Sequence, residues 1–189
     1  MTFTDRLLQR WRIAKIKPFL KSGDRVLDIG SADGVLFQKL PWLARESLGI
    51  DPTLTGNVTV AGVRLVRGFF PADLPPAVAP FDAITMLAVL EHFPEAAYQD
   101  LVTGCARTLR PGGRLLITVP SPFVDKILAV LTFLRLVHGM SLEEHHGYEV
   151  GHTTRLFAPP GFQLICQRRF QLGLNNLFVF ERTAQVTNS

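Results

Sequence analysis

Cysteine is scarce in this sequence, and neither sign of charge dominates. The 189 residues include only Cys105 and Cys166, which stand far apart in apolar surroundings. Without a Cys-x-x-Cys pair, neither a disulfide scaffold nor a cysteine metal site is expected, and buried thiols suit a reducing compartment. Lys and Arg number 20 against 16 Asp and Glu, a net charge of +4. This excess is too small for a dedicated nucleic-acid-binding protein, so no nucleic-acid partner is expected.

Long apolar runs are also missing. The apolar stretch from Ile127 to Leu134 falls well short of the ~20 residues that a membrane-spanning helix needs. Charged residues between Asp5 and Arg12 interrupt the first segment, so no secretion signal is predicted and a cytoplasmic location is expected. The length and the 47% of hydrophobic residues suit one domain with one core over residues 1–189.

Short apolar runs alternate with helical patterns along most of the chain. An amphipathic, basic helix is expected within residues 1–22. The predicted strands are 25–29, 47–51, 64–67, 81–87 and 114–119, with helices at 35–44 and 95–109. This alternation predicts an α/β fold with a doubly wound, mostly parallel sheet. Two more strands, at 162–170 and 176–182, are too close for a helix between them, so a seven-stranded sheet with a C-terminal antiparallel hairpin is expected.

The turn after the first strand favours a cationic nucleoside as ligand. Gly30 and Gly34 allow a sharp bend and a close approach of the ligand to the main chain. A dinucleotide site would need G-x-G-x-x-G, but Ala32 replaces the second glycine and no third one follows, which disfavours a nicotinamide-dependent oxidoreductase. The charge of Asp28 opposes a pyrophosphate. Asp51, at the end of the second strand, can accept hydrogen bonds from both ribose hydroxyls.

Four segments resemble, in family order, the motifs of class I S-adenosylmethionine-dependent methyltransferases. They are residues 26–34, 48–52, 80–92 and 109–120. The resemblance implies a Rossmann-like methyltransferase fold, enzymatic methyl transfer, S-adenosylmethionine as cofactor and S-adenosylhomocysteine as product. It further implies three binding roles. Asp28 and the backbone of Gly30, Ser31, Ala32 and Gly34 would hold the methionine part, Asp51 and Pro52 the ribose, and the Leu87 carbonyl the methionine amino group.

The adenine position departs from the family pattern. The family often has an acidic residue after the third strand, where this sequence has Gly68-Phe69-Phe70. Adenine is therefore expected to rely on backbone contacts and on an aromatic face from Phe69 or Phe70. The alternative is that both phenylalanines only fill the core.

Four histidines are candidate general bases, because histidine titrates near neutral pH. His92 follows the fourth strand beside Glu91, and its alternative role is structural. His145, His146 and His152 lie in a polar cluster after the fifth strand, whose alternative is a solvated loop. Some members of the family bind a divalent metal through E-x-x-E-H at this fourth strand. Ala88 replaces the first Glu here, so no metal is expected.

Residues 121–161 are expected to form an apolar insertion or lid between the fifth and sixth strands and one wall of an acceptor pocket. Its apolar helix, near 123–138, could replace the usual crossover helix or touch a membrane surface. The expected function is methyl transfer to a small-molecule or saccharide acceptor, lipid-linked or free. The alternative is a non-catalytic methyltransferase-fold protein that binds a partner or a membrane through this insertion.

Overall fold

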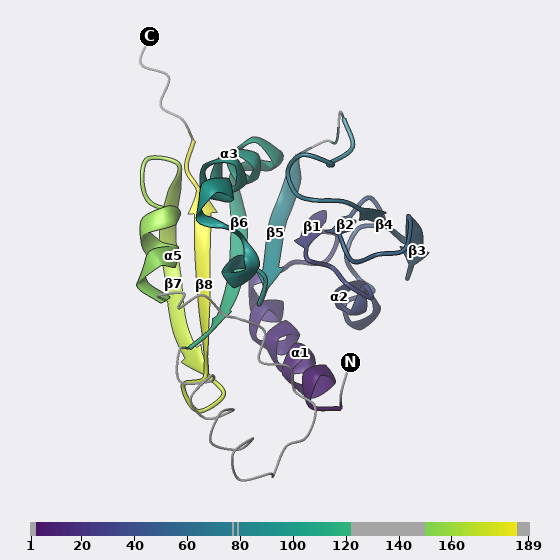
Figure 1. Ribbon diagram of the computed structural model, residues 1–189, viewed down its shortest axis with the longest axis horizontal. Helices are drawn as coiled ribbons and strands as arrows, with labels where there is room; N and C mark the ends of the chain where they lie inside the picture. Colours follow the sequence, from purple (N-terminus) through teal and green to yellow (C-terminus); the bar gives the residue numbers. More distant parts are fainter. Residues whose placement is uncertain (1–2, 77, 79, 122–149, 185–189) are drawn as a thin grey trace.

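A mixed sheet of eight strands forms the centre of the computed structural model, which describes residues 3–76, 78, 80–121 and 150–184 (Figure 1). The strand order is β3-β4-β2-β1-β5-β6-β8-β7. The strands are β1 Val26–Ile29, β2 Leu48–Asp51, β3 Val58–Val60, β4 Val63–Arg67, β5 Phe81–Leu87, β6 Leu109–Pro120, β7 Phe162–Phe170 and β8 Asn175–Arg182. Strands β4, β2, β1, β5 and β6 pair in parallel, whereas β8 is antiparallel to both β6 and β7. The expected fold class with its C-terminal hairpin is confirmed.

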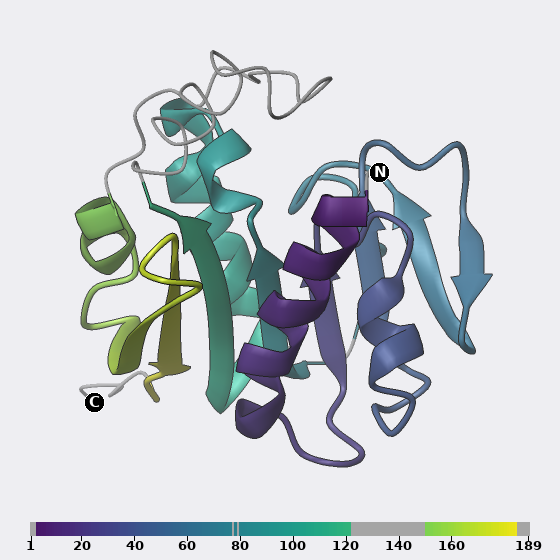
Figure 2. The same cartoon turned by 90° about the horizontal axis from the view of Figure 1, so that it is seen from below.

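Helices cover both faces of the sheet. On one face lie α1 (Phe3–Ile16) and α2 (Val35–Lys39), and Figure 2 shows them together in front of the strands, with α3 (Tyr98–Thr108) behind. The side chains of α3 share a core cluster with those of α5 (Val150–Leu156). Alternate residues of each strand point to opposite faces, so the sheet supports two separate apolar clusters. Three short 3-10 helices, η1 Lys17–Phe19, η2 Leu90–His92 and η3 Glu95–Ala97, complete the described elements.

Two helices end earlier than the sequence pattern predicts, and in both cases a proline follows. α1 ends at Ile16, and the chain continues through η1, which contains Pro18. α2 ends at Lys39, where Pro41 disfavours helical backbone at the residue before it, Leu40.

The eighth strand, β3, was not predicted. It pairs with β4 as a hairpin through Ala61 and Gly62, which have φ values of +52° and +83°. Such positive φ values at both turn residues are typical of tight hairpin turns. Two of its three residues are exposed, so β3 offers no buried apolar run from which a strand could be predicted.

The expected insertion falls mostly outside the described residues. Residues 122–149, which include the apolar helix near 123–138 and both His145 and His146, are not described. The described end of the insertion is α5, followed by Phe157, whose ring packs against Phe162 and Phe180. Among the described helices, none has the length and apolar character needed to cross a membrane.

Candidate functional site

The glycine turn after β1 is fastened to the end of β2. The main-chain N–H groups of Gly30 and Ser31 donate to the carbonyl oxygen of Ile50, at N···O distances of 2.9 and 3.3 Å. The N–H of Ala32 donates to Asp51 Oδ2 at 2.8 Å. The turn and the end of β2 therefore form one unit at the carboxyl end of the sheet, where ligands bind in open α/β folds.

Backbone conformations that favour glycine gather on two facing loops. Gly30 has a φ of +76°, and a Cβ added to it would lie 2.3 Å from Val89 Cγ2, in the loop after β5. Gly34 also has a positive φ. Ala32 and Ala88 have φ values of +42° and +58° although neither is glycine. Such strained positions cluster at ligand sites, and here they occur on the turn after β1 and on the loop after β5, which approach each other at Gly30 and Val89.

Asp28 is buried at the end of β1 beside other carboxylates. Only 5% of its surface is exposed, and the Thr85 hydroxyl of β5 donates to its Oδ1 at 2.6 Å. Burial raises the pKa of Asp28 to about 7; the hydrogen bond from Thr85 lowers it, and the charges of Asp51 and Asp33 raise it further. A buried carboxyl group surrounded by like charge favours a cationic ligand.

Asp51 already accepts three hydrogen bonds in this structure. Besides the bond from Ala32, its Oδ1 accepts from the N–H of Thr53 at 2.7 Å and from the Thr53 hydroxyl at 2.5 Å. A carboxylate has about four acceptor positions. Two ribose hydroxyls would therefore have to displace one present donor, and the Thr53 hydroxyl is the one that can rotate away. Pro52 lies exposed beside it.

The two phenylalanines after β4 have different surroundings. Phe69 is 68% exposed, whereas Phe70 is 6% exposed and belongs to the core, with its ring packed close to Gly104 of α3. Asp73 Oδ2 accepts a hydrogen bond from the Phe69 N–H at 2.8 Å and so fixes this loop. Of the two candidates for adenine contact, Phe69 has the accessible ring. Leu87, at the end of β5, is half-buried.

Glu91 and His92 of η2 face in different directions. His92 is exposed, whereas Glu91 is 9% exposed and its Oε2 has no hydrogen-bond partner within the described part of the chain. Burial raises the pKa of Glu91 to about 7, although a backbone hydrogen bond and Arg12 lower it. The carboxyl group, rather than the imidazole, is thus the buried titratable group at this point.

His152 of α5 contacts α3. Its imidazole packs edge-on against the Tyr98 ring, with centroids 5.2 Å apart at 80°. His145 and His146 lie outside the described residues. Across the described ranges, no group of three metal-ligating side chains comes together. The catalytic roles of His92, His145, His146 and His152 stay predictions.

Unsatisfied polar side chains concentrate at the carboxyl end of the sheet. Buried polar atoms without a hydrogen-bond partner are rare in folded proteins and often mark a ligand site. Besides Glu91, such atoms occur within the described chain in the glycine turn, at the end of β6 and at the turn from β7 to β8. They are Ser31 Oγ, Thr118 Oγ1, Gln171 Nε2 and Asn175 Oδ1.

The end of β6 and the turn from β7 to β8 carry a cluster of buried polar side chains that the sequence analysis did not identify. Ser121 Oγ donates to the Gly173 carbonyl at 2.6 Å and accepts from Asn176 Nδ2 at 2.9 Å. The Asn175 amide donates to Gln171 Oε1. All four of these side chains are buried. We call Thr118, Ser121, Gln171, Asn175 and Asn176 the polar wall.

Three other side chains support the cofactor residues but were missed as well. Thr85 pairs in register with Asp28, and Thr53 holds Asp51. Gln9 of α1 donates to Asp33 Oδ1 at 3.4 Å, so the opening helix lies against the glycine turn. A single threonine within the apolar run from Ala83 to Leu87 was the available signal for Thr85.

The family profile described as "Methyltransferase domain" matches residues 3–167. Ubiquinone biosynthesis O-methyltransferase of Xylella fastidiosa (strain M23) is 35% identical over 122 residues, which cover 58% of this chain and 48% of that one. The enzyme with the same name from Paracidovorax citrulli is 28% identical over 136 residues, which cover 67% and 56%. The chain thus spans about half the length of the curated relatives it matches.

Solved structures share the fold. The pyocyanin biosynthetic protein PhzM superposes with a TM-score of 0.64 at 19% identity, over 93% of this chain and 55% of that one. A TehB-like S-adenosylmethionine-dependent methyltransferase from Corynebacterium glutamicum gives 0.63 at 16% identity, over 95% and 97%. The glycopeptide N-methyltransferase MtfA, solved with S-adenosylhomocysteine, gives 0.59 at 12% identity, over 91% and 88%.

The sheet order, the glycine turn and the acidic ends of β1 and β2 define the class I S-adenosylmethionine-dependent methyltransferase fold. With the profile covering most of its length, the chain belongs to the methyltransferase-domain family. The expectations of a methyltransferase and of S-adenosylmethionine as cofactor are confirmed at the level of this domain.

Proposed function

We propose that the protein transfers the methyl group of S-adenosylmethionine to an oxygen atom of a small-molecule or saccharide acceptor. The observation that carries this proposal is the buried pair Asp28 and Asp51, at the ends of neighbouring strands around a glycine turn with strained backbone. That arrangement fits a ligand with positive charge and a ribose, but no phosphate.

Each part of the cofactor has a matching group in this chain. When bound, S-adenosylmethionine supplies an electrophilic methyl group on a positively charged sulfur. Asp28 would stabilise that positive charge, with Thr85 holding the carboxylate in place. Asp51 would accept the ribose hydroxyls, the Leu87 carbonyl would accept from the methionine amino group, and Phe69 would offer its exposed ring to adenine.

Two observations favour oxygen as the methyl-accepting atom. The curated relatives are named O-methyltransferases. In addition, three atoms of the polar wall, Gln171 Nε2, Asn175 Oδ1 and Thr118 Oγ1, are buried and have no hydrogen-bond partner within the described part of the chain. A hydroxyl group both donates and accepts a hydrogen bond, so a polyhydroxylated acceptor can satisfy these atoms.

Positioning is expected to contribute most of the rate, because the reaction is an in-line displacement. A hydroxyl acceptor must also lose its proton, which calls for a base that titrates near neutral pH. The four histidines remain the candidates. Among the described ones, His152 is half-buried against Tyr98, which suits a base that needs a fixed orientation.

The proposal is tested first by ligand binding and then by turnover. S-adenosylhomocysteine at about a hundred times its Kd should stabilise the protein by about 2.7 kcal/mol, while NAD should not. Transfer of a radiolabelled methyl group is then measured with two acceptor panels, simple glycosides and apolar phenols. We expect turnover with glycosides. Turnover with phenols alone would refute the saccharide acceptor, and binding without turnover on any acceptor would favour the non-catalytic alternative.

Three related points remain proposals. They are the single domain over residues 1–189, the cytoplasmic location and a peripheral contact between the 121–161 segment and a membrane. None is needed for the binding and turnover experiments, which use the full chain.

A further inference from the structure

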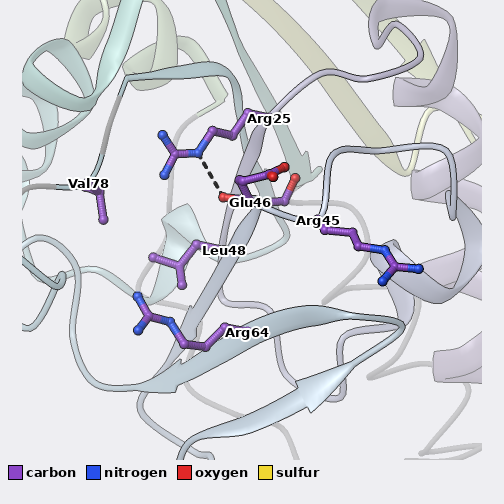
Figure 3. Close-up of a pocket in the computed structure, with 7 residues that line it drawn as sticks. Arg25, Arg45, Glu46, Leu48, Arg64 and Val78 are labelled. Carbon is purple, nitrogen blue, oxygen red and sulfur yellow. Dashed lines mark hydrogen bonds between the residues drawn. The ribbon is translucent and has the colours of Figure 1, made fainter.

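A cavity lies at the opposite end of the sheet from the cofactor residues. It has a volume of about 250 Å³, and its lining includes Arg25, Arg45, Glu46, Leu48 and Arg64 (Figure 3). Arg25 directly precedes β1, Glu46 lies just before β2, and Arg64 is the second residue of β4. These strands are parallel, so the cavity is at their amino ends, whereas the methyl-transfer residues stand at their carboxyl ends.

Two of the arginines share one face of the sheet with Leu48. Leu48 pairs in parallel register with Leu27 on one side and with Arg64 on the other. Residues two apart along a strand share a face, so Arg25 lies on the same face as Leu27. Figure 3 agrees, because the guanidinium groups of Arg25 and Arg64 lie on the same side, with Leu48 between them, while Arg45 extends the other way.

Arg25 is held firmly at the wall of the cavity. Its Nε donates to the carbonyl oxygen of Glu46 at 2.8 Å. Its guanidinium carbon lies 4.7 Å from the centroid of the Phe81 ring, which belongs to the same core cluster as Leu48. A guanidinium fixed in this way loses little side-chain entropy when it binds a ligand, which is the usual advantage of a preorganised site.

The charge and the size of the cavity limit what it can bind. Even without Arg45, which extends the other way, Arg25 and Arg64 outnumber the carboxylate of Glu46, so the lining has a net positive charge. The volume is below the roughly 300 Å³ at which pockets for drug-sized ligands begin, and it corresponds to about eight waters at ~30 Å³ each. The planar fork of a guanidinium matches pairs of phosphate oxygens. A small, highly charged anion fits better than a whole nucleotide.

We propose that this cavity, which we call the arginine pocket, binds a phosphate or diphosphate group, either as a free anion or as part of a phospholipid head group. Arg25 and Arg64 would contact the group from opposite sides above Leu48. The site is separate from the methyl-transfer site, and its existence does not depend on the proposed acceptor.

The test measures the affinity of the full chain for pyrophosphate by calorimetry. Arg64→Glu reverses one charge of the pocket, and Arg64→Gln removes the charge while keeping a long side chain. The matched control is Arg168→Glu, because Arg168 is also an exposed strand arginine but stands on β7, at the other edge of the sheet. S-adenosylhomocysteine affinity is measured on each variant as a check of folding.

We expect Arg64→Glu to weaken pyrophosphate binding at least about tenfold, the size of one lost charge-assisted interaction. Arg64→Gln should have a smaller effect in the same direction, and Arg168→Glu should change the affinity less than about twofold, as remote surface substitutions usually do. All three variants should bind S-adenosylhomocysteine as the wild type does.

Vesicles distinguish the two sources of the phosphate group. Binding to phosphatidic acid vesicles, lost in Arg64→Glu and kept in Arg168→Glu, would identify a lipid head group. Pyrophosphate binding without such vesicle binding would identify a soluble anion. The proposal is overturned if the wild type binds neither, or if Arg168→Glu weakens binding as much as Arg64→Glu, since general attraction to a basic surface would then suffice. If the wild type binds pyrophosphate but not S-adenosylhomocysteine, the result counts against the methyltransferase proposal and not against the arginine pocket.

Discussion

The two ends of the central strands carry opposite chemistry. At the carboxyl ends of β1 and β2, Asp28 and Asp51 are buried, and the loops around them have strained backbone and unsatisfied polar atoms. At the amino ends, Arg25 is half-buried and Arg64 is exposed. Asp82 of β5 accepts hydrogen bonds from the Arg25 main-chain N–H and from the Arg110 side chain. At the amino ends Asp82 is paired within the chain, whereas at the carboxyl ends several buried polar atoms have no hydrogen-bond partner among the described residues. The difference indicates which end is built for catalysis.

The largest effect is expected from the candidate bases. Replacing His145, His146 and His152 together by Ala should lower kcat by about 10²- to 10⁴-fold if one of them removes the acceptor proton. S-adenosylhomocysteine affinity should stay within about 0.5 kcal/mol, because the cofactor residues lie between Asp28 and His92. Turnover and calorimetry on the same preparation check both numbers. Full turnover would mean that none of these histidines is the base, and lost cofactor binding would mean that at least one of them contacts the cofactor.

The next effect concerns stability and pH. Because burial raises the pKa of Asp28 from its ordinary value of 3.8 to about 7 in the folded chain, the folded state keeps this proton to a higher pH than the unfolded state does. The stabilisation is complete below about pH 4 and is lost as the pH rises to about 7. Glu91 titrates in the same window and in the same direction. The ligand-free protein should thus become less stable between these pH values.

Asp28→Asn should flatten this dependence. At about 1.4 kcal/mol per pKa unit, the variant should gain at most about 4 kcal/mol over the wild type at pH 8, relative to their difference at pH 4. Its affinity for S-adenosylmethionine should fall, because the neutral amide no longer attracts the sulfonium. Urea unfolding at several pH values measures the first effect and calorimetry the second. An unchanged slope against pH would show that Asp28 is ionised throughout.

A smaller effect is expected for Asp51→Ala. The substitution should weaken the binding of S-adenosylhomocysteine by roughly 1.5 to 3 kcal/mol, the usual range for hydrogen bonds to a charged group. The control at the other end of the sheet is Asp82→Ala, which breaks the 2.6 Å ion pair with Arg110 and should leave this affinity unchanged. Calorimetry on both variants makes the comparison. Equal losses would remove the distinction between the two ends, and unchanged affinity in Asp51→Ala would refute its role at the ribose.

No effect is expected from removal of metal ions. With Ala88 in place of the first Glu of the metal pattern, activity on any acceptor should survive EDTA. A loss that Mg²⁺ or Mn²⁺ restores would show that Glu91 and His92 take part in a metal site after all.

The sequence predicted the parts of the fold that rest on short apolar runs. The bounds of β5 match the expected ones, because a buried strand reads as a nearly continuous apolar segment. The bounds of β7 match as well, although most of its residues are exposed, because Gly161 and Gly173 mark turns at its two ends. The edge strand β3 and the early end of α2 were missed. β3 is mostly exposed, so its sequence shows no buried apolar pattern. The end of α2 depends on the local backbone conformation at Leu40.

The sequence predicted the site residues that belong to a local motif, but not those whose role depends on a partner from another strand. Asp28, Gly30 and Asp51 carry a recognisable spacing. The bond from Thr85 to Asp28 depends on the register of β5 against β1, which no spacing reveals. Likewise, the 3-10 turn η2 decides that Glu91 is buried and His92 exposed. Within the polar wall, Ser121 and Asn176 are 55 positions apart and meet because β6 and β8 pair in antiparallel fashion.

The cluster of carboxylates around Asp28 also bears on product inhibition. Methyl transfer removes the positive charge from sulfur, so the product presents a neutral thioether to the same buried negative field. The cofactor site therefore attracts the positively charged sulfur of S-adenosylmethionine but not the neutral sulfur of the product. We therefore expect the product to compete less well at alkaline pH, where Asp28 is fully ionised, than near pH 6, where it is largely protonated. Burial of one aspartate would thus help to clear the site between turnovers.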